Sequence, residues 1–215
     1  MAETVVWADR RVVDGDVVVR GFHSTREADV VPGVLWLSPS PISMAPPLVL
    51  LGYGGSGHKR SERICGLARW FASRAGVAVL AIDGPYRGER VPSPLAAAEY
   101  QARIAAEGID VVLDRVTDDW RAAADAIGSL GVADTGNLAY LGMSMGTRFG
   151  IPLAAALGGR LRCVVLGKFG LRQGPGLHKG LEARMASSVA VAGVVRPSWR
   201  FSRAVASRRV KVWST

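Results

Sequence analysis

The chain has 215 residues, of which 49% are hydrophobic and 21% are charged, and its formal net charge is +9. This length and apolar content are enough to bury a full core, which excludes a chain that is disordered throughout. The charge is uneven: residues 1–167 carry 17 basic and 17 acidic side chains, whereas residues 168–215 carry 10 basic side chains and one acidic side chain. The excess therefore belongs to the last segment and does not predict a nucleic-acid-binding fold.

Two cysteines, Cys65 and Cys163, stand 98 positions apart, without a CxxC pair or a histidine cluster beside them. This spacing predicts neither a disulfide framework nor a zinc site. The N-terminal sequence contains acidic residues and no continuous apolar segment, and no apolar run elsewhere approaches the roughly 20 residues that span a bilayer. We therefore expect no membrane segment and a soluble, cytoplasmic protein.

Along residues 1–167, short runs of β-branched residues alternate with longer amphipathic stretches, separated by glycine and proline clusters. This alternation is typical of a largely parallel sheet with crossover helices. The predicted strands are residues 17–22, 31–37, 48–53, 77–83, 138–143 and 163–167. The last four are apolar at nearly every position, as expected for strands that are covered on both faces. The fold class is therefore α/β.

Between the strands, the pattern predicts one extended loop and several helices. The proline-rich connection at residues 38–47 is expected to be extended. Residues 60–75 place apolar side chains three and four positions apart, which predicts a helix that Gly76 ends. Further helices are expected at about residues 95–106 and at residues 110–129.

The segment Gly142-Met143-Ser144-Met145-Gly146 follows an apolar strand and precedes a stretch that can be helical through Leu157. A GxSxG pattern in this context is typical of a strand that turns sharply into a helix, where only small residues fit two positions before and two positions after the serine. The turn exposes the serine hydroxyl at the carboxyl end of the sheet, in a strained backbone conformation. Ser144 is therefore a candidate nucleophile.

A glycine-rich loop, Gly52-Tyr53-Gly54-Gly55-Ser56-Gly57-His58-Lys59, follows an earlier strand. Its glycines allow backbone N–H groups to converge on one point. One of these groups, together with the N–H of Met145, would form an oxyanion hole.

A competing interpretation of this loop is a dinucleotide-binding turn. Gly52, Gly54 and Gly57 match GxGxxG, and Asp83 ends the next predicted strand. However, the loop follows the third predicted strand rather than the first, and the sequence has no GxxxxGK[ST] motif. We therefore favour the oxyanion loop.

In this order and at these separations, the segments LVLLGYGGSGHK, AIDGPYRGER and LGMSMGTRFG resemble three segments of the α/β-hydrolases. These are the oxyanion loop, the loop after the next strand, and the nucleophile turn. The resemblance covers residues 17–167 and is nearest to the dienelactone hydrolase-like and acyl-peptidase-like esterases. It implies that Ser144 is the nucleophile and that the N–H groups of Met145 and of Gly54 or Gly55 bind the oxyanion. It also implies a small ester-like substrate and no metal or organic cofactor.

Three further residues are candidates for lining the substrate pocket. They are Tyr53, where many relatives have histidine; His58, beside the oxyanion loop; and Arg87, in the loop after Asp83. For that last loop the simpler interpretation is that Asp83 caps the turn, while Arg87 and Glu89 pair with their neighbours or with each other.

The acid and the histidine of this family follow the nucleophile in the chain, and neither has a clear counterpart here. After Ser144 the sequence contains one histidine, His178, and one acidic residue, Glu182, in the reverse of the family order. A serine hydrolase without its base loses on the order of a millionfold in turnover. His178 is the candidate base, and the alternative is an inactive remnant or binding protein that retains the hydrolase fold.

Residues 168–215 do not resemble the family. We therefore expect an incomplete hydrolase core at residues 1–167, without its last strands, and a basic segment after it. That segment is rich in Ala, Val, Ser, Arg and Gly, which is typical of an out-of-frame translation of GC-rich DNA. We hypothesise a shifted reading frame after about Lys168. The alternatives are a helix packed on the body and, more weakly, a segment that binds nucleic acid or an anionic surface. The sequence does not predict the oligomeric state.

Overall fold

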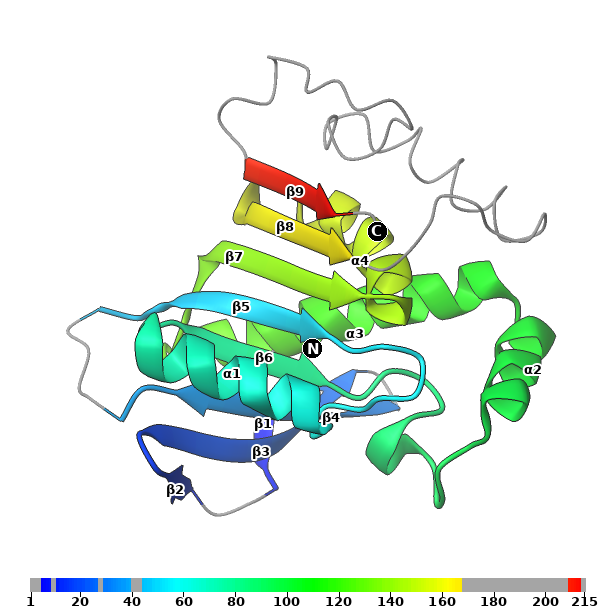
Figure 1. The fold of residues 1–215 in the computed structure, drawn as a ribbon, viewed down its shortest axis with the longest axis horizontal. Coiled ribbons are helices and arrows are strands. Elements are labelled where there is room, and N and C mark those ends of the chain that lie inside the picture. Colours follow the sequence, from blue (N-terminus) through cyan, green and yellow to red (C-terminus); the bar gives the residue numbers. More distant parts are fainter. Residues whose placement is uncertain (1–4, 9–10, 27–28, 40–43, 168–208, 214–215) are drawn as a thin grey trace.

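The computed structural model describes residues 5–8, 11–26, 29–39, 44–167 and 209–213. Within these residues the strands are β1 (Val5–Trp7), β2 (Val12–Asp14), β3 (Val17–Arg26), β4 (Asp29–Leu37), β5 (Pro47–Gly52), β6 (Ala78–Ile82), β7 (Asp134–Met143), β8 (Leu161–Gly167) and β9 (Arg209–Trp213). They form one sheet in the order β1-β3-β4-β6-β5-β7-β8-β9, with β2 paired to β3 (Figure 1). The neighbours from β6 to β9 are parallel, and the pairs among β1 to β4 and between β4 and β6 are antiparallel.

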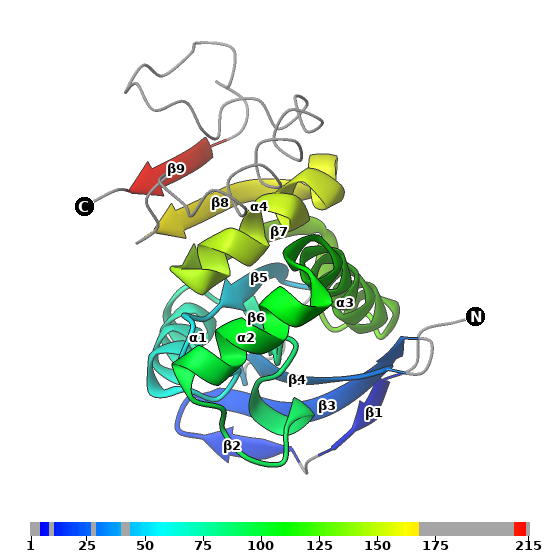
Figure 2. The same cartoon turned by 90° about the vertical axis from the view of Figure 1, so that its right-hand side faces the viewer.

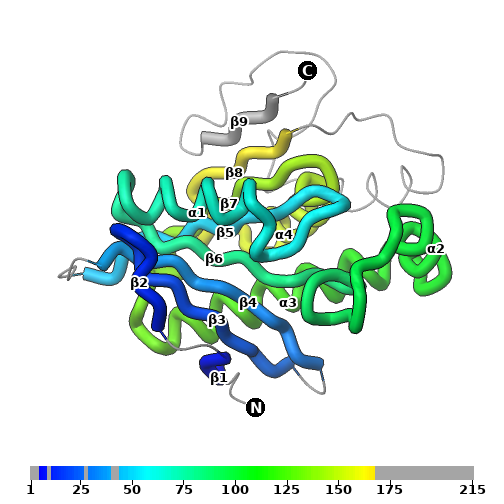
Figure 3. Tube along the Cα trace, turned by 60° about the horizontal axis from the view of Figure 1, so that its bottom comes forward, coloured from blue at the N-terminus to red at the C-terminus, as the bar shows by residue number. Residues whose placement is uncertain are grey.

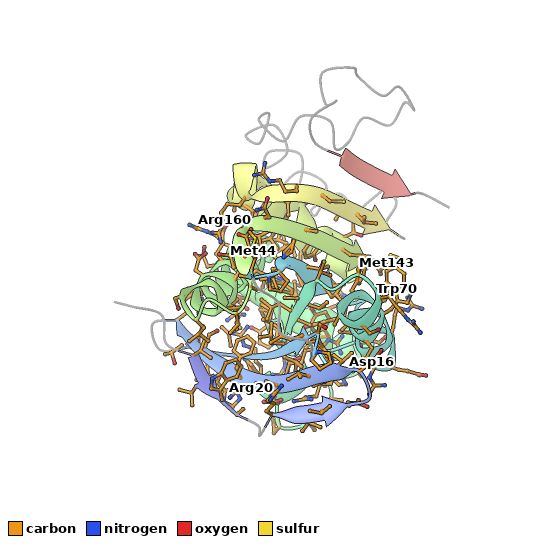
Figure 4. All side chains as sticks on the ribbon, turned by 90° about the vertical axis from the view of Figure 1, so that its left-hand side faces the viewer. Asp16, Arg20, Met44, Trp70, Met143 and Arg160 are labelled. Atoms are coloured by element: carbon orange, nitrogen blue, oxygen red, sulfur yellow. The ribbon has the colours of Figure 1, made fainter. Side chains whose placement is uncertain are left out.

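The helices lie on both faces of the sheet. They are α1 (Glu62–Arg74), α2 (Ala97–Glu107), α3 (Ile109–Ser129) and α4 (Met145–Leu157), with short 3₁₀ turns η1 (Gly88–Arg90) and η2 (Gly158–Arg160). Helix α1 covers one face, and α3 and α4 cover the other (Figures 1 and 3). The outer side of α1 carries Trp70, which is 57% exposed (Figure 4).

The side chains of the central strands point alternately to the two faces of the sheet and so form two separate hydrophobic cores. In β5, Leu48 and Leu50 belong to the core beneath α3 and α4, whereas Val49 and Leu51 belong to the core beneath α1. Successive strand residues point to opposite faces, so a strand that is apolar at every position requires helices on both sides. The prediction of an α/β sheet with helices on both faces is confirmed.

Each predicted strand and helix is present, with ends that differ by a few residues. The sequence pattern missed β1 and β2, which have only three residues each and lie at the edge of the sheet. It also placed no strand after residue 167. In the structure, β9 comes from the basic segment and pairs in parallel with β8, with Arg209 opposite Cys163. The sheet therefore extends one strand beyond β8.

The parallel strands β5, β6, β7 and β8 end at the same edge of the sheet, which Figure 2 shows from the front. Leu50 pairs with Leu80 and Gly52 pairs with Gly142, so the loops after β5, β6 and β7 leave this edge side by side. The register of the sheet therefore brings the three sequence motifs together.

Within the described residues, no helix has the length and apolar character required to cross a bilayer.

Candidate active site

Ser144 occupies a strained turn between β7 and α4. Its backbone has φ 57° and ψ −113°, a conformation that residues other than glycine rarely adopt. The Ser144 N–H donates a hydrogen bond to the Gly167 carbonyl at 2.8 Å, and the Ser144 carbonyl accepts one from the Thr147 N–H at 2.9 Å. The strained conformation predicted for Ser144 is confirmed, and backbone bonds on both sides hold it in place.

The two glycines of the motif are required by close backbone contacts. A Cβ atom on Gly142 would lie 2.4 Å from the Gly146 carbonyl oxygen, and one on Gly146 would lie 2.7 Å from the Gly52 carbonyl group. Contacts this short between a side chain and backbone are not accommodated without a shift of the chain. The sequence prediction that only small residues fit two positions before and two positions after the serine is therefore confirmed.

Two polar side chains beneath the turn were missed from the sequence. The buried Tyr140 hydroxyl donates to the Gly146 carbonyl at 2.5 Å. The Thr147 hydroxyl lies 3.0 Å from the Gly142 carbonyl and 2.8 Å from the Gly167 carbonyl. Burial raises the pKa of Tyr140 and keeps its hydroxyl a neutral donor. The sequence did carry a signal for Tyr140, because it is a tyrosine in an otherwise apolar strand. A hydroxyl buried in such a strand requires a hydrogen-bond partner.

The candidate oxyanion donors lie next to Ser144. A Cβ atom on Gly54 would be 3.9 Å from Ser144 Cβ, and one on Gly55 would be 3.8 Å from Met145 Cε. Helix α4 begins at Met145, so the Met145 N–H has no acceptor within the helix. Met143, the residue before Ser144, lies at the carboxyl end of β7 (Figure 4). The structure thus brings together the serine, the start of the helix and the glycine-rich loop.

Tyr53 supports the glycine-rich loop. Its buried hydroxyl accepts a hydrogen bond of 2.6 Å from the Gly84 N–H, in the loop after β6. Burial, and secondarily the Asp83 carboxylate, raise the pKa of Tyr53 well above its ordinary value. The ring also lines a small void with Phe149 and Tyr140. Its role as a substrate-pocket residue stays a prediction.

Asp83, at the start of the loop after β6, is the centre of a hydrogen-bond network. Asp83 is fully buried, and its carboxylate accepts hydrogen bonds from the Lys59 N–H at 3.0 Å, from Lys59 Nζ at 2.5 Å and from the Glu89 N–H at 2.9 Å. The prediction that Asp83 caps this turn is confirmed. Because these groups already bind the carboxylate, it is not available to a ribose hydroxyl, which weakens the dinucleotide interpretation.

Arg87 and Glu89 both find neighbours, but not each other. Arg87 is buried, and its guanidinium carbon lies 3.8 Å from the centre of the Tyr100 ring. Glu89 pairs with Lys59 at 2.5 Å and with His23 at 3.1 Å. A direct role of Arg87 in the substrate pocket stays a prediction.

Neither histidine of the described part of the chain forms a hydrogen bond with Ser144. His23 pairs with Glu89, and His58 is exposed, with its Nδ1 atom accepting a hydrogen bond from the Arg60 N–H at 3.2 Å. The candidate base, His178, lies outside the described residues. Among the described residues, no group of three His, Cys, Asp or Glu side chains is arranged to hold a metal ion.

The sheet order, the strained serine turn after β7 and the glycine-rich loop after β5 define the α/β-hydrolase fold. At the sequence level, no protein-family model and no curated protein matches the chain. Among solved structures, the chain is similar to a PEG-bound cold-adapted esterase from an Arctic intertidal metagenomic library. The TM-score is 0.70, with 26% identity over 98% of this chain and 90% of that chain.

The native structure of that esterase gives a TM-score of 0.62 and 28% identity over 86% of this chain and 72% of that chain. Acetyl xylan esterase 1 from Thermoanaerobacterium has the same fold, with a TM-score of 0.59 and 11% identity over 89% of this chain and 66% of that chain. The predicted resemblance to the α/β-hydrolase esterases is confirmed, and the two cold-adapted esterase structures support a hydrolase.

Proposed function

We propose that the protein is a serine esterase that transfers the acyl group of a small ester to Ser144 and then to water. The observation that carries the proposal is the φ of 57° at Ser144, in a turn that lies against the Gly54–Gly55 loop. Strain of this kind persists where the surrounding structure enforces it, and it is found most often at functional sites. The esterase neighbours support the substrate class.

In the first step, Ser144 Oγ attacks the ester carbonyl carbon while its proton passes to a base. The carbonyl oxygen becomes an oxyanion, and the N–H groups of Met145 and of Gly54 or Gly55 donate hydrogen bonds to it. The positive end of the α4 dipole lies at the same place. One oxyanion donor typically contributes a factor of about 10² to 10³ in turnover.

In the second step, the bond between the carbonyl carbon and the alcohol oxygen breaks, and the alcohol leaves with the proton held by the base. Water then attacks the acyl carbon on Ser144 and gives one proton to the same base. The bond between this carbon and Ser144 Oγ breaks, Ser144 Oγ takes the proton back from the base, and the carboxylic acid leaves. Both half-reactions pass through an oxyanion at the same position, so the same N–H groups serve both.

Within the described residues, no hydrogen bond joins Ser144 to His23, which pairs with Glu89, or to His58, which accepts one from the Arg60 N–H. We propose His178 as the base. It is the one histidine that follows Ser144 in the sequence.

The test is hydrolysis of p-nitrophenyl acetate by the full chain. We expect Ser144→Ala and His178→Ala to lower kcat to the background rate, a loss on the order of a millionfold in a working serine hydrolase. Ser56→Ala, in the same loop but at an exposed position, is the matched control and should retain activity. Unchanged turnover in Ser144→Ala would remove the serine from the mechanism, and unchanged turnover in His178→Ala would remove that histidine.

A second candidate is a catalytically inactive binding protein with the hydrolase fold. One observation favours it: within the described residues, the Ser144 hydroxyl has no histidine partner. This candidate predicts that the wild-type chain does not hydrolyse p-nitrophenyl acetate: p-nitrophenol appears neither in an initial burst nor in the steady state.

A further inference from the structure

The two ends of the glycine-rich loop are anchored on two adjacent residues after β6, Gly84 and Asp83. At the start of the loop, the Tyr53 hydroxyl accepts a hydrogen bond from the Gly84 N–H at 2.6 Å. At its end, Lys59 binds the Asp83 carboxylate through its backbone N–H, at 3.0 Å, and through Nζ, at 2.5 Å. The segment between these anchors contains the two candidate oxyanion donors.

We propose that Lys59 and Asp83 are positioning residues, which hold the Gly54 and Gly55 N–H groups in the geometry that binds the oxyanion. The proposal rests on the proposed esterase function. The hydrogen bonds of the two side chains go to each other and to Glu89. They hold the loop at its end, and the Tyr53 hydroxyl is a second, uncharged anchor at its start.

The burial of this ion pair supports a specific role. Lys59 is 3% exposed and Asp83 is fully buried, so each charge has lost most of its contact with water. A buried ion pair is often no more stabilising than apolar residues of the same size, whereas removing one partner is strongly destabilising. The pair therefore fixes the position of the two segments more than it adds to stability.

The composition of the loop explains why anchors are needed. Gly52, Gly54, Gly55 and Gly57 permit many backbone conformations, and glycine loses the most conformational freedom on ordering. Within the loop, one backbone hydrogen bond, from the Gly57 N–H to the Gly54 carbonyl at 2.9 Å, closes a turn. That turn orders the loop internally, and the two side-chain anchors fix it relative to Ser144.

Glu89 completes the electrostatic environment of Lys59. Its carboxylate lies 2.5 Å from Lys59 Nζ and 3.1 Å from His23 Nε2, and its side chain is 51% exposed. Lys59 thus has one buried and one half-exposed carboxylate partner. The buried partner also receives the backbone N–H of Lys59, and we assign the positioning role to this pair for that reason.

The first experiment compares Lys59→Met, Lys59→Arg and the control Arg69→Met in the full chain, with p-nitrophenyl acetate as substrate. Arg69 also forms an ion pair, with Asp14, but on the exposed surface of α1. We expect Lys59→Met to lower kcat by about 10-fold to 100-fold with KM within about threefold, because a displaced oxyanion donor affects the transition state. Lys59→Arg should recover part of the loss, and Arg69→Met should stay within about twofold of wild type.

The second experiment does not depend on turnover. Amide hydrogen exchange of residues 53–59 is measured in the wild type, in Lys59→Met and in Tyr53→Phe, which keeps the ring and removes the hydroxyl acceptor. We expect at least tenfold faster exchange of the Gly54 and Gly55 amides in both variants, and no change in that region for Arg69→Met. If Lys59→Met does not fold, Asp83→Asn, which keeps the size of the side chain and removes its charge, carries both measurements.

The two proposals fail in different ways. An inactive wild type overturns the esterase function, and activity that persists in Ser144→Ala removes Ser144 as its nucleophile. In either case hydrogen exchange still decides the role of the anchors. Unchanged exchange in Lys59→Met, or in Asp83→Asn where it takes its place, overturns the positioning role. So does a folded Lys59→Met with wild-type kcat or with a loss expressed in KM alone.

Discussion

Gly52, at the end of β5, and Gly146, in the first turn of α4, are in direct backbone contact. A Cβ atom on Gly146 would lie 2.7 Å from both the carbonyl carbon and the carbonyl oxygen of Gly52. In the sheet register, Gly52 stands opposite Gly142, so the loop after β5 leaves the sheet beside the serine turn. This contact sets the distance between the glycine-rich loop and Ser144, and it depends on residues without side chains.

We predict that Gly146→Ala destabilises the fold and reduces activity. The added methyl group meets backbone atoms that cannot rotate away, and overpacking of this kind costs about 1 to 3 kcal/mol. The control is Gly66→Ala in α1, where nothing lies within 4 Å of the new Cβ. Because alanine is the better helix former, this control should be neutral or slightly stabilising. Urea unfolding of both variants checks the prediction, and equal midpoints would contradict it.

A second prediction concerns Asp119, a buried carboxylate of α3. It is fully buried and pairs with Arg26 Nε at 3.1 Å and with Arg90 Nη1 at 2.5 Å, joining β3, α3 and the 3₁₀ turn after β6. Asp119→Ala leaves two arginines without this partner, and we expect a loss of about 3 to 5 kcal/mol in the free energy of unfolding.

The neighbouring Asp118 is the matched control. It is half-exposed and pairs with Arg121 at 3.5 Å, so Asp118→Ala should cost less than about 1 kcal/mol. Chemical denaturation of both variants gives the comparison. A loss in Asp119→Ala no greater than that in Asp118→Ala would show that the buried network does not hold these elements together.

The pH dependence of stability provides a third prediction, through Glu89. Partial burial raises the pKa of Glu89, but hydrogen bonds from Lys59 and His23 outweigh it and leave the pKa below its ordinary value. Folding therefore favours the ionised carboxylate. Its stabilisation is fully present above the ordinary carboxyl pKa of about 4.3 and is lost as the pH falls through the lower folded value.

The comparison is between the wild type and Glu89→Gln. The difference in their free energies of unfolding should be largest near neutral pH and should shrink below about pH 4, where the wild-type carboxylate becomes protonated. Unfolding curves collected from pH 7 to pH 3 test this expectation. A difference that stays constant over the whole range would refute the ion-pair interpretation of Glu89.

Much of the fold and part of the site were predictable from local patterns. The apolar runs of β5 to β8 and the spacing of apolar residues in α1 depend on neighbours in sequence, and these elements are confirmed. The requirement for glycine at positions 142 and 146 was also predictable, because it follows from the turn itself.

Other features depend on pairs that are distant in the sequence. Lys59 binds Asp83, 24 positions away, and Asp119 binds Arg26, 93 positions away. No periodic pattern marks such pairs, because they form only when separate loops and helices meet. Strand β9 was missed for a similar reason, since its pairing with β8 joins segments that are distant in the chain.

The most direct test of the central claim is the reaction of the full chain with a fluorophosphonate, followed by intact-mass measurement and peptide mapping. We predict one covalent adduct per chain, located on Ser144, with no adduct in Ser144→Ala and with labelling retained in Ser56→Ala. Equal labelling of the wild type and Ser144→Ala, or an unmodified wild type under conditions that label a known serine esterase completely, would contradict Ser144 as the nucleophile.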